Sequence, residues 1–530
     1  MCPAPQALIE QSFWVRFAMG SNLARALCAS LALAGLVSCS RSPNPHNAVT
    51  MLIENSPTNL DPRIGTDAQS EHIDPLIFDS LVRRNDRFGL DPWLAERWET
   101  PDPLTVIFHL RSDVKFQNSQ PLTSRDVKWT LDSILNGTVV TIKSGSYRTI
   151  QSVDAPDATT VVIHMKKADP ALLWNLCDGA FGVVPYGSGR DFWRHPIGSG
   201  PFRFVSQEID KDVILERASS YWGQMPHIEH IRFAVVPDAT TRALELEKGS
   251  ADVAVNALSQ DMIYALRRKS NLVIEDGPGT VLNYIVFNVR DPLLKDARVR
   301  RAINLAINRP LIIHSLLRGL AREANGILPP EHWAYWASPS SLHDAAFDPA
   351  AANALLDTAG YRRGADGIRF HLGMKTSTDE TTRLLSVIVQ QQLAQIGIAL
   401  DLRSYEFATF YADLTKGAFQ LAPSRWIGGN ESPDIFHYAY SALSFPPHGG
   451  NRGYYSNPEL DRLLDDAAAT TDQPRQQADY AKAQQILAHD LPSLNLWYLD
   501  TVVIHSRRLG NVHTSPSGNF EFLRTAEIQP

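Results

Sequence analysis

The residue patterns best suited to catalysis or metal binding are rare in this sequence. It contains no GxxxxGK[ST] loop for a nucleotide phosphate, no HExxH pair for zinc and no GxSxG elbow for a nucleophilic serine. His227 and His230, in HIEH, are suitable metal ligands by type. They stand at the entrance of a predicted strand, however, where residues three apart point to opposite faces. We therefore predict no metal site, no cofactor and no catalytic residue, and expect that the chain is not an enzyme.

A binding loop is a better interpretation of residues 424–436, SRWIGGNESPDIF. Gly428 and Gly429 allow backbone angles and a close approach that other residues forbid. Trp426 offers a flat apolar face with one N–H donor, and Asn430 offers two donors and an acceptor. These properties favour contact with a ligand. The alternative is that Trp426 fills a core beneath a glycine turn.

The elements that must position these residues alternate between strands and helices. Apolar alternation predicts a strand over 105–111, and Thr123 with Asp126 predicts a capping box for the next helix. Residues 240–255 are typical of a helix ended by Gly249 and followed by a strand. The remaining predicted elements are helices over 296–308 and 457–468 and a strand over 494–506. The expected fold class is α/β, in several units.

Composition and charge indicate an ordinary globular protein. Hydrophobic residues make up 44% and charged residues 20% of the 530 residues, and the net charge of −7 includes no block of like charges. A nucleic-acid partner would require a basic face, so we predict none. The length corresponds to roughly three to four units of about 150 residues.

The first forty residues have the features of a lipoprotein signal peptide. Residues 26–37, ALCASLALAGLV, are uncharged but shorter than the roughly 20 apolar residues of a membrane span. They end in LVSC at 36–39, which resembles a bacterial lipobox and implies diacylglycerol on the Cys39 sulfur. The alternative is an ordinary signal peptide with a chance cysteine.

Processing at this point defines the mature chain. The predicted signal peptide covers residues 1–38, with Met19 as a second candidate start, and a polar, proline-containing tether follows over 39–48. Apart from the lipidated Cys39, only Cys177 then remains. No internal disulfide is possible, and Cys177 is predicted to be a small buried hydrophobic residue.

Longer segments, taken in order, resemble one family. They are IENSPTNLDPR at 53–63, FHLRSDVKFQNSQPLTSRDV at 108–127, IGSGPFRF at 197–204, YWGQMPHIEHIRFAVVPDATTRALELEKGSADV at 221–253 and NYIVFNVRDPLLKDARVRRAINLAINR at 283–309. Behind a lipobox, this set resembles family 5 of the bacterial extracytoplasmic solute-binding proteins, the dipeptide-, oligopeptide- and nickel-binding group. The resemblance covers about residues 49–526.

This resemblance implies an α/β, two-lobed periplasmic-binding-protein fold (type II) with an extra inserted domain. The implied domains are lobe I over 49–80, 197–288 and 490–530, an inserted domain over 81–196, and lobe II over 289–489. The implied function is that of a substrate-binding lipoprotein of an ABC importer. Such a protein captures peptides or peptide-like solutes between its lobes and delivers them to a permease with ATPase subunits. We expect a monomer on the periplasmic side of the cell envelope, anchored to a membrane by lipid.

The resemblance also points to a missing anchor. In dipeptide- and oligopeptide-binding relatives the matching segment carries Trp, two residues and then an Asp that pairs with the peptide's α-ammonium. Counted from Trp426, that position falls on Gly429. Either another acid serves, with Glu431 and Asp434 the nearest, or the solute has no free amine, because a buried ammonium without a partner costs several kcal/mol.

Further candidates stand at predicted strand ends. Ser56 ends the first strand, while Asn283 and Tyr284 begin a strand near the expected crossing between lobes. Arg425 and Lys375 are either partners for a solute carboxylate or solvated surface charges. The predicted ligand-binding set is Ser56, Asn283, Tyr284, Trp426, Gly429 and Asn430.

Three functions remain open at this stage. The first is a receptor for peptides or peptide-like solutes. The second is a receptor of the same fold for a non-peptide solute such as a nickel chelate or a sugar, which the missing Asp favours. The third, of a different class, is a secreted lipid-anchored hydrolase.

Overall fold

Two large β-sheets organise the part of the chain that the structure describes. The structure is a computed structural model, and it describes residues 47–337, 346–470 and 472–529. A seven-stranded sheet has the order β12-β19-β11-β1-β10-β9-β8, and a six-stranded sheet has the order β14-β18-β13-β17-β15-β16. Helices and strands alternate, so the predicted α/β class is confirmed.

The seven-stranded sheet draws its strands from distant parts of the chain. They are β1 (Ala48–Ile53), β8 (Phe202–Glu208), β9 (Asp212–Arg217), β10 (His230–Val235), β11 (Val253–Val255), β12 (Leu272–Gly277) and β19 (Thr501–Ser506). All six residues of β1 are buried, and β1 pairs in parallel with both β10 and β11. This is the pattern of a central strand covered on both faces. Helix α2 (Ala68–Ile77) contacts β8 of this sheet. Helix α5 (Ala239–Lys248) connects β10 to β11, and α6 (Gln260–Leu266) connects β11 to β12.

The six-stranded sheet has one edge where several strand ends meet. Its strands are β13 (Leu282–Phe287), β14 (Ala321–Glu323), β15 (Phe370–Ser377), β16 (Ile398–Tyr405), β17 (Leu421–Trp426) and β18 (Ser493–Leu499). β15 is parallel to both β16 and β17, whereas β13 is antiparallel to β17 and β18. The carboxyl ends of β15, β16 and β17 therefore share an edge with the amino end of β13.

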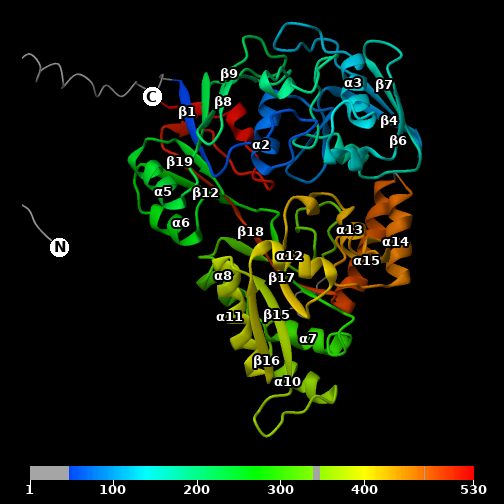
Figure 1. Ribbon diagram of the computed structural model, residues 1–530, viewed down its shortest axis with the longest axis vertical. Helices are drawn as coiled ribbons and strands as arrows, with labels where there is room; N and C mark the ends of the chain where they lie inside the picture. The colour runs from blue at the N-terminus through cyan, green and yellow to red at the C-terminus, as the bar shows by residue number, and fades with distance from the viewer. Residues whose placement is uncertain (1–46, 338–345, 471, 530) are drawn as a thin grey trace, which may run out of the picture. The chain divides into compact units, whose positions relative to one another are not determined.

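Helices connect and cover these strands. They are α7 (Ala297–Ala306), α8 (Arg309–Ser315), α10 (Pro349–Thr358), α11 (Glu380–Gln395), α12 (Phe407–Lys416), α13 (Ile435–Tyr440), α14 (Pro458–Ala468) and α15 (Gln473–Asp490). Helix α11 packs on β15 and β16, and α14 lies against α15 (Figure 1). In the described residues, no helix combines the length and apolar character required to cross a bilayer.

A smaller sheet forms a third packed unit. Its order is β4-β5-β7-β6, with β4 (Ala95–Asp102), β5 (Thr105–Leu110), β6 (Ile150–Asp154) and β7 (Thr160–Met165). Helix α3 (Ser124–Leu135) packs on β6 and β7. Phe108, Leu131 and Ile163 lie in its separate hydrophobic core. Cys177 is buried in the same core, as predicted.

The shorter elements complete the chain. Among the described residues they are β2 (Val82–Arg84), β3 (Leu90–Pro92), β20 (Leu509–Gly510), β21 (Glu527–Ile528), α4 (Leu172–Asn175) and short 3-10 helices, of which η3 (Gly429–Glu431) bears on the site.

Local signals in the sequence give the element boundaries well. Asp126 accepts a hydrogen bond from the backbone N–H of Thr123 at 2.8 Å, which forms the predicted capping box of α3. Gly249 ends α5 with a φ of 71°, and the Asn457 side chain caps α14. The segment predicted as one strand over 494–506 forms β18 and β19 in two different sheets, since each half finds different pairing partners.

The sheets divide the sequence differently from the predicted lobes in two places. β13 and β18 fall within ranges predicted for lobe I, yet both pair in the six-stranded sheet. The domain boundaries themselves stay predictions.

Candidate functional site

A cavity of about 480 Å³ lies at the shared edge of the six-stranded sheet. This volume is within the range of roughly 300–1,000 Å³ that is usual for small-ligand pockets. In open α/β sheets, ligands bind beyond the carboxyl ends of the strands, which is where this cavity lies. Its polar lining consists of Gln260, Asn283, Tyr284, Ser377, Asp379, Thr381, Thr382, Tyr411, Ser424, Arg425 and Arg452.

Two strand-to-helix turns build one side of the cavity. β15 ends at Ser377, and Asp379 then caps α11 by accepting a hydrogen bond from the backbone N–H of Thr382 at 2.8 Å. β16 ends at Tyr405, and Glu406 caps α12 in the same way. The first turns of both helices therefore present polar and aromatic residues to the cavity.

The Asn283 and Arg425 side chains form a fixed pair in the wall. Asn283 and Arg425 are direct partners across β13 and β17, and Arg425 Nε donates a hydrogen bond to Asn283 Oδ1 at 3.2 Å. Arg425 Nη2 lies 3.3 Å from Asp379 Oδ1. Burial acts to raise the pKa of Asp379, but the hydrogen bonds from Thr382 and the charge of Arg425 outweigh it, so the pKa is lowered. Asp379 is therefore ionised and already has its partners.

Aromatic rings and a second arginine form another part of the wall. The Tyr284 ring stacks flat on Trp426, with centroids 5.7 Å apart and planes 3° apart. The Arg452 guanidinium carbon lies 5.2 Å from the centre of the Trp426 ring and 5.4 Å from that of Tyr411. Its Nη1 and Nη2 are 3.4 Å from the Tyr284 hydroxyl and 3.3 Å from the Tyr411 hydroxyl. Burial raises the pKa of Tyr284, so its hydroxyl is neutral at pH 7.

The structure brings together some of the predicted ligand residues. Asn283 and Tyr284 line the cavity. Trp426 packs against the ring of Tyr284, is only 9% exposed and does not line the cavity. Ser56 follows β1 in the other large sheet, where its Oγ accepts a hydrogen bond from the backbone N–H of Asp210 at 2.7 Å. The ligand-binding roles of these residues stay predictions.

The end of the 424–436 segment serves the fold. Gly428, with a φ of 72°, precedes η3, which begins at Gly429. Asn430 is fully buried, and its Nδ2 donates hydrogen bonds to the carbonyl oxygens of Thr280 at 2.8 Å and Ile327 at 3.2 Å. Both amide donors of Asn430 are thus used within the protein, which favours a structural role for it.

The structure shows the contacts of the acids and cations that the sequence analysis named. Glu431 is 4% exposed, and its carboxylate contacts Arg84 Nη1 at 2.5 Å and Thr280 Oγ1 at 3.2 Å. Lys375 Nζ lies 2.7 Å from Asp413 and does not line the cavity. Of the two predicted cations, only Arg425 reaches this site.

Sequence reasoning missed Arg452 and Tyr411. Arg452 comes from the loop between α13 and α14, and Tyr411 comes from α12. Arg452 meets Tyr284 and Tyr411 only through tertiary packing, and no local pattern in the sequence marks Arg452 or Tyr411.

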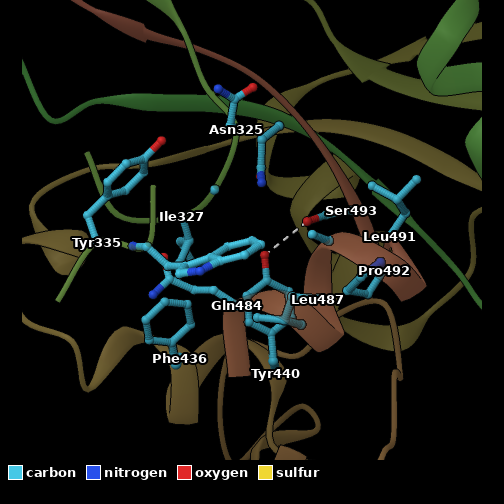
Figure 2. A pocket seen from close by; sticks show the side chains of 14 residues that line it. Asn325, Ile327, Tyr335, Phe436, Tyr440, Gln484, Leu487, Leu491, Pro492 and Ser493 are labelled. Atoms are coloured by element: carbon cyan, nitrogen blue, oxygen red, sulfur yellow. Dashed lines mark hydrogen bonds between the residues drawn. The ribbon is translucent and has the colours of Figure 1, made fainter. Parts of the chain in front are cut away.

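Two other cavities are less suited to a polar solute. One, of about 390 Å³, lies between the four-stranded unit and the region of α14 and α15, and includes Trp98, Trp174 and Trp333. Its Asp169 carboxylate is already bonded to Thr149. The other, shown in Figure 2, is only about 40 Å³ and lies where the Tyr440 hydroxyl meets Ser493 at 3.0 Å. That volume suits one or two waters.

Metal-ligand residue types do not gather in the described part of the chain. No group of three or more His, Cys, Asp and Glu side chains there could hold a metal ion. His230 begins β10, and His227 lies outside that strand, 3.5 Å from Glu527.

Comparison with known proteins gives a consistent result. Residues 89–444 match the bacterial extracellular solute-binding proteins, family 5 (middle part). The dipeptide-binding protein of Escherichia coli is 25% identical over 470 residues, covering 83% of this chain and 87% of that protein. The glutathione-binding protein GsiB of Pectobacterium atrosepticum is 28% identical over 478 residues, covering 88% and 91%.

Solved structures share the fold. The crystal structure of NikA from Brucella suis in complex with Fe(III)-EDTA has a TM-score of 0.81 at 24% identity, covering 91% of this chain and all of that chain. The predicted two-lobed binding-protein fold is thereby confirmed. Because the family match extends over more than half of the sequence, the chain belongs to family 5 of the bacterial extracellular solute-binding proteins and is a solute-binding protein, not an enzyme.

Proposed function

We propose that this protein captures peptides or peptide-like solutes outside the cytoplasm and delivers them to the permease of an ABC importer, whose ATPase subunits supply the energy. Membership of family 5 supports the transport role. The names of the dipeptide-binding and glutathione-binding relatives favour a peptide-like solute.

The observation that carries this proposal is the cavity at the strand ends. Its walls offer fixed hydrogen-bond donors in Asn283, Arg425 and Arg452, which suit the carbonyl and carboxylate oxygens of a peptide. Gln260, on α6, reaches the lining from the side of the seven-stranded sheet. A solute that contacts both parts would favour closure, since only differential affinity for the closed state shifts the equilibrium.

A thermal-shift screen of the purified protein against peptide libraries tests the proposal. A genuine solute should raise the unfolding temperature as its concentration increases. At a hundred times its Kd, the solute should add about 2.7 kcal/mol to the free energy of unfolding. Titration calorimetry of the best peptides should then give the same Kd. If no peptide stabilises a correctly folded sample, the peptide part of the proposal is wrong.

A metal chelate or another non-peptide solute is the second candidate. Gly429 stands where peptide-binding relatives carry the amine-pairing Asp, and the NikA structure with the same fold contains Fe(III)-EDTA. Native mass spectrometry of protein purified without refolding distinguishes the two candidates. A co-purified chelate or sugar would favour this second function, whereas a co-purified peptide would eliminate it.

We further propose that the protein acts as a monomer on the periplasmic side of the cell envelope, held to a membrane by lipid on Cys39. The LVSC sequence at 36–39 supports the lipid anchor. Residues 1–46, including Cys39, lie outside the described residues.

A further inference from the structure

The charges that line the 480 Å³ cavity do not balance. Arg425 and Arg452 are the cations of the lining, and Asp379 is its carboxylate. Asp379 accepts hydrogen bonds from both the backbone N–H and the hydroxyl of Thr382, and it contacts Arg425. Within the described ranges, one positive charge of the lining, that of Arg452, remains without a carboxylate.

The surroundings of Arg452 are neutral. The side chain is half-buried, and it contacts the hydroxyls of Tyr284 and Tyr411 and the ring faces of Tyr411 and Trp426. Among the described residues, no carboxylate oxygen lies within 4.0 Å of its guanidinium. An arginine stays protonated, so this charge must be met by solvent or by a ligand. Its flat set of N–H donors matches a carboxylate or a phosphate-like group.

Asn283 provides a second, independent sign that the ligand is an acceptor. Its Oδ1 must face Arg425, because an arginine has donors only and Nε donates to it at 3.2 Å. This fixes Nδ2 as the other end of the amide, and Nδ2 is buried without a hydrogen-bond partner in the part of the chain that the structure describes. Asn283 is only 7% exposed and lines the cavity. A buried donor without an acceptor is costly, and a ligand oxygen would satisfy it.

Among the described residues, the one carboxylate that lines this cavity and could meet a solute amine is Asp379, which already accepts from Thr382 and contacts Arg425. Glu431, the acid nearest to the missing Asp position, is buried against Arg84 and Thr280. Glu431 and Asp434 do not line the cavity. Apolar contact is available instead, since Phe407 is 62% exposed and Ile427 is 73% exposed at the lining.

We propose that this cavity selects solutes that carry an anionic oxygen group, either a carboxylate or a phosphonate, together with an apolar part and no free amine near it. Arg452 is the residue that determines this specificity by pairing with the anionic group. Asn283 and Tyr284 point to opposite faces of β13, so Asn283 Nδ2 meets a separate acceptor oxygen of the solute. This inference rests on the proposed solute-binding function and specifies the charge of its solute.

Four probes with one side-chain framework test the charge requirement: Ala-Phe, N-acetyl-Ala-Phe, N-acetyl-Ala-Phe-amide and Ala-Phe-amide. They differ in the charge of the amine and of the carboxylate, and the two acetylated probes also carry an acetyl group. We expect N-acetyl-Ala-Phe to bind most tightly in titration calorimetry at low salt. The neutral amide should bind about tenfold to a hundredfold more weakly, as expected for one lost charge-assisted contact. The cationic Ala-Phe-amide should bind worst. Phenylalkylphosphonates form a further arm, which shows whether the group must be a carboxylate.

Variants of Arg452 connect the charge requirement to the residue. Arg452→Gln should weaken binding of N-acetyl-Ala-Phe about tenfold to a hundredfold and remove the difference between it and its amide. Arg452→Lys keeps the positive charge and should retain part of the difference in affinity between N-acetyl-Ala-Phe and its amide. This variant replaces Arg452→Gln in the test if the Gln variant does not fold. Arg290 stacks on Tyr454 outside the cavity, and Arg290→Gln is the matched control, with unchanged affinity expected.

Two results would overturn the inference. One is tighter binding of Ala-Phe-amide than of N-acetyl-Ala-Phe, and the other is undiminished binding of the anionic probe by a folded Arg452→Gln variant. Either leaves the solute-binding function intact, because a solute still binds. If no probe and no peptide of the library screen binds the parent protein, the inference and the proposed peptide function both fail.

Discussion

Single buried side chains set the chemistry around the 424–436 segment. His332 is 3% exposed, and its Nδ1 accepts a hydrogen bond from the backbone N–H of Ala334 at 3.0 Å. Its Nε2 lies 3.1 Å from the carbonyl oxygen of Glu431, so Nε2 carries the proton. A second proton on Nδ1 would face the Ala334 N–H, another donor. This geometry holds the ring neutral, and burial lowers the pKa of His332 to about 4.

Protonation of His332 should therefore destabilise the protein in mild acid. An unfolded histidine titrates near 6.5, so between pH 6.5 and about 4 the unfolded state binds more protons and stability falls as the pH falls. The loss is about 2 kcal/mol at pH 5. Chemical unfolding at pH 7 and pH 5 should show that the His332→Gln variant loses less stability between the two pH values than the parent does.

The exposed His195 provides the control for this measurement. His195→Gln should lose as much stability as the parent between pH 7 and pH 5. Equal losses in the parent and both variants would show that His332 is not held neutral.

At the scale of elements, β2 and η3 are joined by one buried ion pair. Arg84 ends β2, and its Nη1 lies 2.5 Å from the Glu431 carboxylate at the end of η3. The Glu431 side chain is 5% exposed and that of Arg84 is 26% exposed. Arg84 Nη2 also donates a hydrogen bond to the carbonyl oxygen of Asp178 at 2.8 Å. The pair thus links parts of the chain that the sequence separates by 347 positions.

Arg84→Met should destabilise the fold by about 3 kcal/mol, because it leaves the Glu431 charge buried without its partner. The double variant Arg84→Met/Glu431→Gln should recover part of this loss, since the uncompensated charge is then removed. Denaturant unfolding of both variants measures the two effects.

An exposed ion pair gives the matched comparison. Arg97 and Glu99 form a pair with side chains 60% and 49% exposed. Arg97→Met should therefore cost less than about 1 kcal/mol. An Arg84→Met variant that is no less stable than Arg97→Met would contradict the role assigned to the buried pair.

At the scale of the whole molecule, the described chain crosses twice between the two large sheets, once from β12 to β13 and once from β18 to β19. Asp500 is the residue between β18 and β19. The segment between β12 and β13 includes Thr280, whose hydroxyl donates a hydrogen bond to the Glu431 carboxylate. Arg318 also contacts Asp261 of α6 at 2.7 Å. Solute-dependent movement of the two sheets would have to occur around the two chain crossings, since these join the sheets covalently.

Attachment of the whole molecule to a membrane is predicted to depend on one sulfur. Cys39→Ala should move the protein from the membrane fraction to the soluble fraction of lysed cells, because the acyl chains supply the membrane affinity. Intact-mass measurement of the parent should show the added lipid. A Ser40→Ala variant is the control and should stay with the membrane. Membrane association that survives Cys39→Ala would refute the anchor.

Short-range order could be predicted from the sequence wherever it depends on neighbouring residues. The capping box at Thr123, the left-handed Gly249 and the Asn457 cap are such cases, since each acts within a few positions. The two-lobed family fold could also be recognised from ordered segments. The division of 494–506 between two sheets could not, because strand partners lie hundreds of residues away.

The sequence by itself determined the α/β class, the family and the glycine at position 429. Only the tertiary structure decided which polar groups are free to meet a solute. Asn430 has the right chemistry for a ligand contact, but its donors are taken by Thr280 and Ile327. Arg452 shows no local signal, yet it lines the cavity, and no described carboxylate pairs with it. The physical reason is that a side chain's availability depends on partners from distant segments, which only folding brings within hydrogen-bond distance.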